Sequence, residues 1–113
     1  MKTFTVLYQM PVAGLEAWMQ KPESERKSME TEMKQDWDAW LEAHKDLVKN
    51  TIGLGTTTRI SAAGASPAKN GLMLSSYVMA ESVEEVVAIF KDHPHLKIPE
   101  ATIDIMEAKP MTA

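Results

Sequence analysis

Two histidines separated by a single proline carry the clearest chemical signal in this chain of 113 residues. His93 and His95 flank Pro94, and imidazole is the side chain whose ordinary pKa lies closest to neutral pH. One of the two could therefore transfer a proton in a buried cleft, as a general acid or base. The alternative is structural: His93 caps the preceding helix, and His95 hydrogen-bonds to the backbone while Leu96 packs. The sequence alone leaves both interpretations open.

A His-x-His pair is also a metal-binding pattern, but a metal ion needs at least a third ligand. Asp92, Asp104 and Glu107 are available in the sequence, without a spacing that singles one of them out. The chain has no cysteine, which excludes disulfides, thiolate zinc sites and cysteine nucleophiles. We therefore expect no metal and no other cofactor.

Aromatic and basic residues elsewhere could line a pocket for a planar ligand. Trp37, Trp40 and Tyr8 supply ring surface, although tryptophans at helical spacing are also explained as core or dimer-interface residues. Arg59 could hold a carboxylate, or it is a solvated charge at a strand end. His44 lies in an apolar helical stripe, where a hydrogen-bonded core histidine is the simpler explanation. These five residues are the candidate ligand-binding residues.

Six segments must position these side chains, and the spacing of apolar residues predicts each of them. Alternating apolar residues and β-branched runs predict strands at 3–10, 56–61, 72–80 and 101–108. Apolar residues three or four positions apart predict a long helix at 24–49 and a shorter helix at 83–92. A Ser82-x-x-Glu85 capping box begins the second helix, and Pro94 prevents its continuation.

The order strand, helix, strand, strand, helix, strand is typical of a ferredoxin-like fold. We therefore expect one α+β domain over 1–113, a βαββαβ chain with a four-stranded antiparallel sheet and two helices on one face. Residues 11–22 either lie over a cleft as a lid or cover the edge of the core as a short helix. The second face of such a sheet carries apolar side chains, which predicts a homodimer that packs sheet against sheet.

Composition narrows the class of partner. With 16 acidic and 12 basic residues, a net charge of −4 and no Lys/Arg cluster, the chain lacks the basic face that nucleic acids require. No apolar run approaches the ~20 residues of a membrane span. The apolar residues near the N-terminus are interrupted by polar ones and indicate a strand instead of a signal peptide. We expect a cytoplasmic protein that contacts neither nucleic acid nor membrane.

Several segments resemble the YCII-related (DGPF-type) proteins. They are Met1-Lys2-x-Phe4-x-Val6-Leu7-Tyr8, Trp37-x-x-Trp40, Leu54-Gly55-x-Thr57-x-Arg59, Lys91-x-His93-Pro94-His95-Leu96, Thr102-Ile103-x-Ile105 and Pro110-Met111. The resemblance spans nearly the whole chain and is most specific in its C-terminal third. It implies the dimeric α/β-barrel superfamily and cofactor-independent activity on a small aromatic or lactone-like compound.

The chain departs from this family at one functional position. Members of the shorter type carry a His–Asp pair in the first helix. Here the corresponding positions hold Glu32 or Met33 and His44 or Asp46, depending on the alignment. The acid–base chemistry of that branch is therefore not carried over to this chain. The residues themselves make His93 or His95 the candidate for proton transfer, with a non-catalytic dimer that binds a metabolite or a protein as the alternative.

Overall fold

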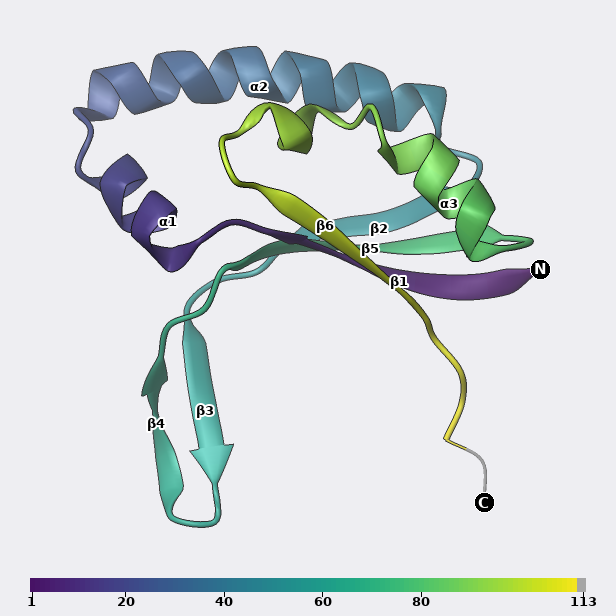
Figure 1. Cartoon of the computed structure of the whole chain (residues 1–113). Coiled ribbons are helices and arrows are strands. Elements are labelled where there is room, and N and C mark those ends of the chain that lie inside the picture. Colours follow the sequence, from purple (N-terminus) through teal and green to yellow (C-terminus); the bar gives the residue numbers. More distant parts are fainter. Residues whose placement is uncertain (112–113) are drawn as a thin grey trace.

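The computed structural model describes residues 1–111 and has one four-stranded antiparallel sheet as its centre (Figure 1). Its strands, in spatial order, are β2 (Val48–Gly53), β5 (Leu72–Ala80), β1 (Lys2–Gln9) and β6 (Thr102–Glu107). The helices in this part of the chain are α1 (Val12–Met19), α2 (Glu23–Ala43), α3 (Val83–Phe90) and a short 3₁₀ helix, η1 (Pro94–Lys97). The prediction of a ferredoxin-like α+β fold is confirmed.

The core lies between the sheet and the layer formed by α2, α3 and η1. Along β1 the side chains of Phe4, Val6 and Tyr8 are buried, while the residues between them are only half-buried. This alternation follows from the pleat of a strand, which sends successive side chains to opposite faces. Trp40 from α2 and Phe90 from α3 pack onto the buried face. Burial of these large apolar side chains is the main source of stability.

The predicted boundaries are wrong between residues 44 and 61. The first helix ends at Ala43 instead of 49, and the second strand of the sheet is Val48–Gly53 instead of 56–61. Leu47 and Val48 continue the helical spacing of apolar residues, but β-branched Val48, Thr51 and Ile52 favour an extended chain. In the structure Val48 pairs with Val78 of β5 and is buried as a strand residue.

The segment 56–61 belongs to a separate hairpin. Strand β3 (Thr57–Ser61) pairs with β4 (Gly64–Ala68), and this two-stranded unit extends from the main sheet on the side away from α2 (Figure 1). The sequence predicts a loop at 62–71, because Gly64 and Pro67 are residues typical of turns. Pro67 is tolerated because β4 pairs on one side only, so a missing backbone donor on the other side breaks no hydrogen bond.

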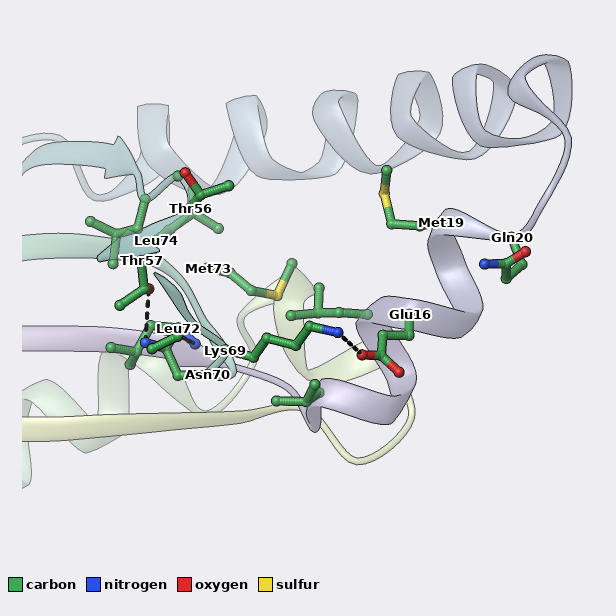
Figure 2. Close-up of a pocket in the computed structure, with 15 residues that line it drawn as sticks. Glu16, Met19, Gln20, Thr56, Thr57, Lys69, Asn70, Leu72, Met73 and Leu74 are labelled. Carbon is green, nitrogen blue, oxygen red and sulfur yellow. Dashed lines mark hydrogen bonds and ion pairs between the residues drawn. The ribbon is translucent and has the colours of Figure 1, made fainter. Parts of the chain in front are cut away.

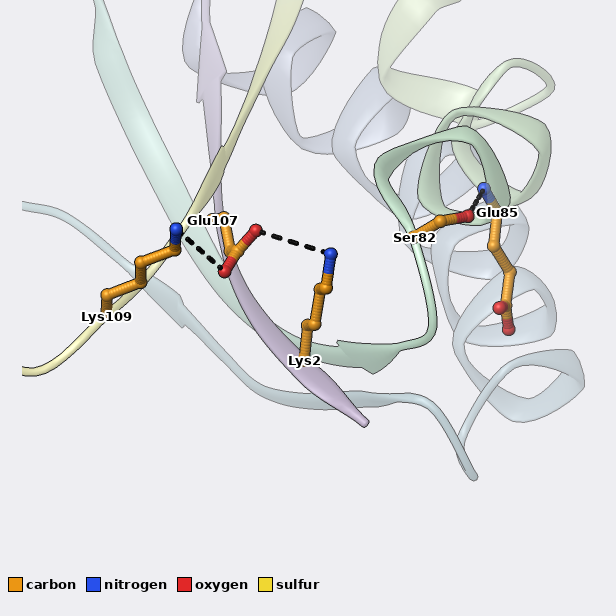
Figure 3. Close-up of polar contacts among 5 residues, drawn as sticks. All are labelled: Lys2, Ser82, Glu85, Glu107 and Lys109. Atoms are coloured by element: carbon orange, nitrogen blue, oxygen red, sulfur yellow. Dashed lines mark hydrogen bonds and ion pairs between the residues drawn. The ribbon is translucent and has the colours of Figure 1, made fainter.

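Helix α3 begins as its sequence predicts. The Ser82 hydroxyl accepts a hydrogen bond from the Glu85 amide at 3.3 Å (Figure 3). A capping box predicts that the Glu85 carboxylate accepts from the Ser82 amide, but here it accepts from the Glu81 amide at 3.1 Å. At the edge of the sheet, Glu107 lies between Lys2 and Lys109, which ties the start of β1 to the end of β6 (Figure 3). None of the helices within residues 1–111 is long and apolar enough to cross a membrane.

Candidate functional site

Five of the predicted site residues meet in one buried cluster between the sheet and the helices. Tyr8 comes from β1, Trp37 and Trp40 from α2, and His93 and His95 from the start of η1. The His93 ring centre is 4.3 Å from that of Trp37, 4.3 Å from that of Trp40 and 5.2 Å from that of Tyr8. His93 and His95 are each only 1% exposed. This group is called the aromatic–histidine cluster below.

Proline and the two histidines build the local structure of η1 together. Pro94 occupies the first turn, where a missing N–H is harmless. The Nδ1 atom of His93 accepts a hydrogen bond from the His95 amide at 2.9 Å and so caps η1. His95 in turn donates from Nε2 to the carbonyl oxygen of Gln9 at 2.9 Å, which fastens η1 to the end of β1. The His95 hydrogen bond matches the structural alternative for that residue. The His93 side chain caps the following η1 and not the preceding helix α3, and Leu96 is 41% exposed instead of packed.

The cap also fixes the tautomer of His93. Since Nδ1 uses its lone pair as an acceptor, the proton of the neutral ring is on Nε2. That Nε2–H and the Nε1–H of Trp40 are both buried and have no hydrogen-bond acceptor among the described residues. Two unpaired donors in a protein interior are unusual. In this state His93 is a hydrogen-bond donor and not a free base.

Burial keeps both histidines uncharged near neutral pH. Desolvation, with the nearby His95 and His44 rings, lowers the pKa of His93 to about 4. Burial also lowers the pKa of His95, and the Gln9 carbonyl opposes part of that change. Desolvation raises the pKa of Tyr8, which therefore stays a neutral phenol. The cluster is thus a set of neutral polar groups held in an apolar surrounding.

The protein is expected to lose stability as the pH falls from 7 to 5. The pKa of His93 is about 4 in the folded chain against 6.5 for a free histidine, so only the unfolded chain takes up this proton. The contribution of His93 to the free energy of unfolding is complete above about pH 6.5 and declines as the pH falls towards about 4. Urea denaturation should give an unfolding free energy roughly 2 kcal/mol lower at pH 5 than at pH 7.

The matched variant for this experiment is His93→Asn. Asparagine keeps a side-chain acceptor for the His95 amide but does not titrate, so the loss of stability between the two pH values should shrink. An unchanged loss in the variant would show that His93 is not the group responsible.

A groove with a volume of about 790 Å³ lies at one end of the sheet, between α1 and the base of the β3–β4 hairpin (Figure 2). Most of its lining is apolar, from Val12, Leu15, Met19, Leu54, Leu72 and Met73. Lys69 and Glu16 point toward one another from its two walls, with 2.9 Å between Nζ and Oε1 (Figure 2). Asn70 donates to the Thr57 hydroxyl at 2.9 Å on the same rim. This is called the α1 groove below.

The α1 groove adjoins the aromatic–histidine cluster without containing it. Leu74, which lines the groove, pairs with Tyr8 across the strands and packs against the core. The short helix expected within 11–22 is α1, which forms one wall of the groove, and a role as a lid stays a prediction. The opposite wall was not predicted, since residues 54–57 and 68–74 meet through the pairing of β3 with β4, a segment expected to be loop.

Two of the predicted ligand-binding residues lie outside the buried cluster. The His44 ring is half-buried at the end of α2, with its centre 4.5 Å from that of Trp40. Arg59 is exposed on β3, on the hairpin, and the structure does not bring it to the histidines. Among residues 1–111, no three His, Asp or Glu side chains are grouped so that they could hold a metal ion.

Comparison with known proteins gives one informative likeness. No family model matches the sequence, and no curated protein matches it. Among solved structures, the chain is similar to 5-chloro-2-hydroxyhydroquinone dehydrochlorinase (TftG) from Burkholderia phenoliruptrix AC1100, in complex with 2,5-dihydroxybenzoquinone. The TM-score is 0.53 at 17% identity, covering 94% of this chain and 93% of that chain. At this identity the likeness establishes the fold and no more.

Proposed function

We propose that this protein binds a small, planar organic molecule in the α1 groove. The observation that carries the proposal is the groove itself, about 790 Å³ in volume, lined mainly by apolar side chains with a few polar groups at its rim. Sites for small molecules have this composition, and their volumes run from roughly 300 to 1,000 Å³. The apolar walls would hold a ring, while Lys69, Asn70 and Thr57 would meet its oxygen atoms.

Two further points support a ring compound bearing hydroxyl or carbonyl groups. The structural neighbour was solved with 2,5-dihydroxybenzoquinone. The sequence resembles YCII-related proteins, and we propose that the chain is a distant member of that family. These points make quinones and hydroxylated aromatic compounds the first ligands to test, and they leave lactone-like compounds as a second class.

Gly55 offers a way to block the groove without straining the fold. A Cβ atom added at Gly55, which lines the groove, or at Gly53, which does not, would meet no atom within 4 Å. We expect Gly55→Trp to weaken binding of 2,5-dihydroxybenzoquinone by about tenfold or more in calorimetry. Gly53→Trp should bind as the unaltered protein does. Equal affinity in the two variants would contradict a ligand site in the α1 groove.

A more specific proposal is that His93 or His95 acts as an acid or a base on the bound molecule. Its support is the unpaired Nε2–H of His93, which could donate to an oxygen of a ligand that reached the cluster. Against a role as base stand the occupied Nδ1 atom and the low pKa of His93. Geometry therefore favours binding over proton abstraction. Loss of turnover in His93→Asn with unchanged ligand affinity would establish the catalytic role instead.

We also propose that two copies pack their sheets together as a dimeric α/β barrel. On the face away from α2, Leu7 pairs with Ser75 and Asp104, while Tyr77 and Met106 are each 46% exposed. Uncovered apolar side chains on a sheet face normally find a partner. The helix layer covers the opposite face only (Figure 1).

Light scattering at micromolar concentration is expected to give twice the 12.6 kDa mass of one chain. Leu7→Glu places a charge at the centre of the proposed interface and should give the mass of one chain. Val87→Glu, on the helix side where Val87 is 51% exposed, should leave the mass unchanged. The mass of a single chain for the unaltered protein would refute the dimer.

A further inference from the structure

Strand β2 contains a β-bulge that changes which of its side chains face the core. Lys49 pairs with Tyr77 and Ile52 pairs with Ser75, so Asn50 and Thr51 together lie opposite Ser76. Asn50 adopts a left-handed backbone conformation, with φ of 51°. An extra residue reverses the alternation of faces from that point on. Thr51 therefore faces inward, where an unbroken strand would have turned it away from the helices.

The inward Thr51 completes a row of three hydroxyl groups across three strands. Its Oγ1 atom is 2.7 Å from the Ser76 Oγ on β5, which is 2.6 Å from the phenol oxygen of Tyr8 on β1. Tyr8 is 0% and Ser76 3% exposed, whereas Thr51 is half-buried. Each hydroxyl has one proton to donate and two lone pairs to accept with. Such a row can be hydrogen-bonded in either direction.

The two ends of the row lie in different surroundings. At the outer end, Asn50 and Thr51 line a second, open groove of about 580 Å³ between α2 and β2, which also exposes the charged groups of Asp38, Glu42 and Lys45. At the inner end, the Tyr8 ring lies 5.2 Å from the His93 ring and 5.7 Å from the His95 ring, centre to centre. The row thus joins an open groove to the aromatic–histidine cluster.

We propose that Thr51 and Ser76 form a proton relay between Tyr8 and the water of this second groove. When hydroxide in this groove removes the Thr51 proton, Thr51 takes a proton from Ser76 and Ser76 takes one from Tyr8. The hydroxide becomes water and Tyr8 becomes a phenolate. The reverse sequence returns a proton from water to Tyr8, and each hydroxyl then has as many O–H bonds as before.

The proton path does not depend on a ligand, because Tyr8 is 0% exposed and does not line the α1 groove. Burial raises the pKa of Tyr8, so its proton is retained at neutral pH and leaves only through a partner. Thr51 and Ser76 act through Tyr8 and are positioning residues.

The experiment measures how fast the Tyr8 hydroxyl proton exchanges with solvent. The chain has two tyrosines, so Tyr77→Phe leaves Tyr8 as the sole reporter. In protein carrying ¹³C at the tyrosine Cζ atom, exchange is followed by NMR in mixed H₂O and D₂O. In this background Thr51→Val, which keeps the shape and removes the hydroxyl, should slow the exchange by about tenfold.

Two controls separate the relay from a packing role. Thr51→Ser restores the hydroxyl and should exchange as the parent does. Thr3→Val removes a hydroxyl that donates to the Met79 sulfur on the other face of the sheet, and it should change nothing. Should Thr51→Val fail to fold, Thr51→Ala carries the same expectation. An exchange rate that is unchanged or faster without the Thr51 hydroxyl would overturn the relay. That result would leave ligand binding in the α1 groove standing, because the Gly55→Trp experiment tests it separately.

Discussion

Replacing Trp40 with alanine is expected to lower the free energy of unfolding by about 3–5 kcal/mol, the largest effect of any substitution considered. Trp40 is 9% exposed, and its ring centre lies 4.8 Å from that of Phe90 and 4.3 Å from that of His93. Its removal leaves a cavity between α2 and the start of η1, where the rigid rings cannot close in. A domain of this size has only about 5–15 kcal/mol of stability in total.

The matched control is Trp18→Ala on α1. Trp18 is half-buried, and α1 has no buried residue. Trp18→Ala should therefore lower the free energy of unfolding by much less than Trp40→Ala does. Urea denaturation of the two variants gives both free energies directly. Equal losses, or a loss below about 1 kcal/mol for Trp40→Ala, would mean that the aromatic–histidine cluster is not a principal support of the fold.

Replacing Gly71 with alanine is expected to lower the free energy of unfolding by about 2–3 kcal/mol, the second largest effect. A Cβ atom at Gly71 would lie 2.1 Å from the carbonyl oxygen of Met10, so one of the two backbones must move. Met10 donates its amide to the Gly71 carbonyl at 3.0 Å, and this contact closes the end of the sheet beside the α1 groove. Only glycine permits so close an approach.

Gly53→Ala provides the comparison for this substitution. A Cβ atom there meets nothing within 4 Å, and alanine restricts the unfolded chain more than glycine does. Its stability should equal or slightly exceed that of the parent. Thermal unfolding of both variants decides the matter, and a Gly71→Ala protein as stable as Gly53→Ala would disprove the proposed close approach.

Much of this fold can be predicted from patterns among residues that are close together in the sequence. The alternation along β1, the Ser82–Glu85 cap and the helix stop before Pro94 each depend on near neighbours, so the sequence predicts them. The end of α2 was missed because Leu47 and Val48 fit both a helix and a strand. Pairing with β5 makes Val48 a strand residue. Pairing with a strand far away in the sequence produces no pattern among neighbouring residues that could have predicted it.

The sequence predicts several residues of the candidate site but not how they are arranged. Tyr8, Trp37 and Trp40 were singled out with the histidines as aromatic candidates, and they do meet. The α1 groove depends on the β3–β4 hairpin, which brings 54–57 to 68–74, and on α1, which lies about fifty positions earlier in the sequence. The inward turn of Thr51 depends on a bulge at Asn50, for which the sequence shows only a residue tolerant of positive φ. Tertiary contacts determine both features.

NMR of the methionine methyl groups tests ligand binding in the α1 groove most directly. Met19 and Met73 line the groove, whereas Met79 and Met106 lie elsewhere on the sheet. With 2,5-dihydroxybenzoquinone as the probe, we expect the Met19 and Met73 signals to move together along one binding curve while the other two stay in place. Motionless Met19 and Met73 signals at a millimolar concentration of the probe, or larger changes at Met79 and Met106, would contradict the proposed function.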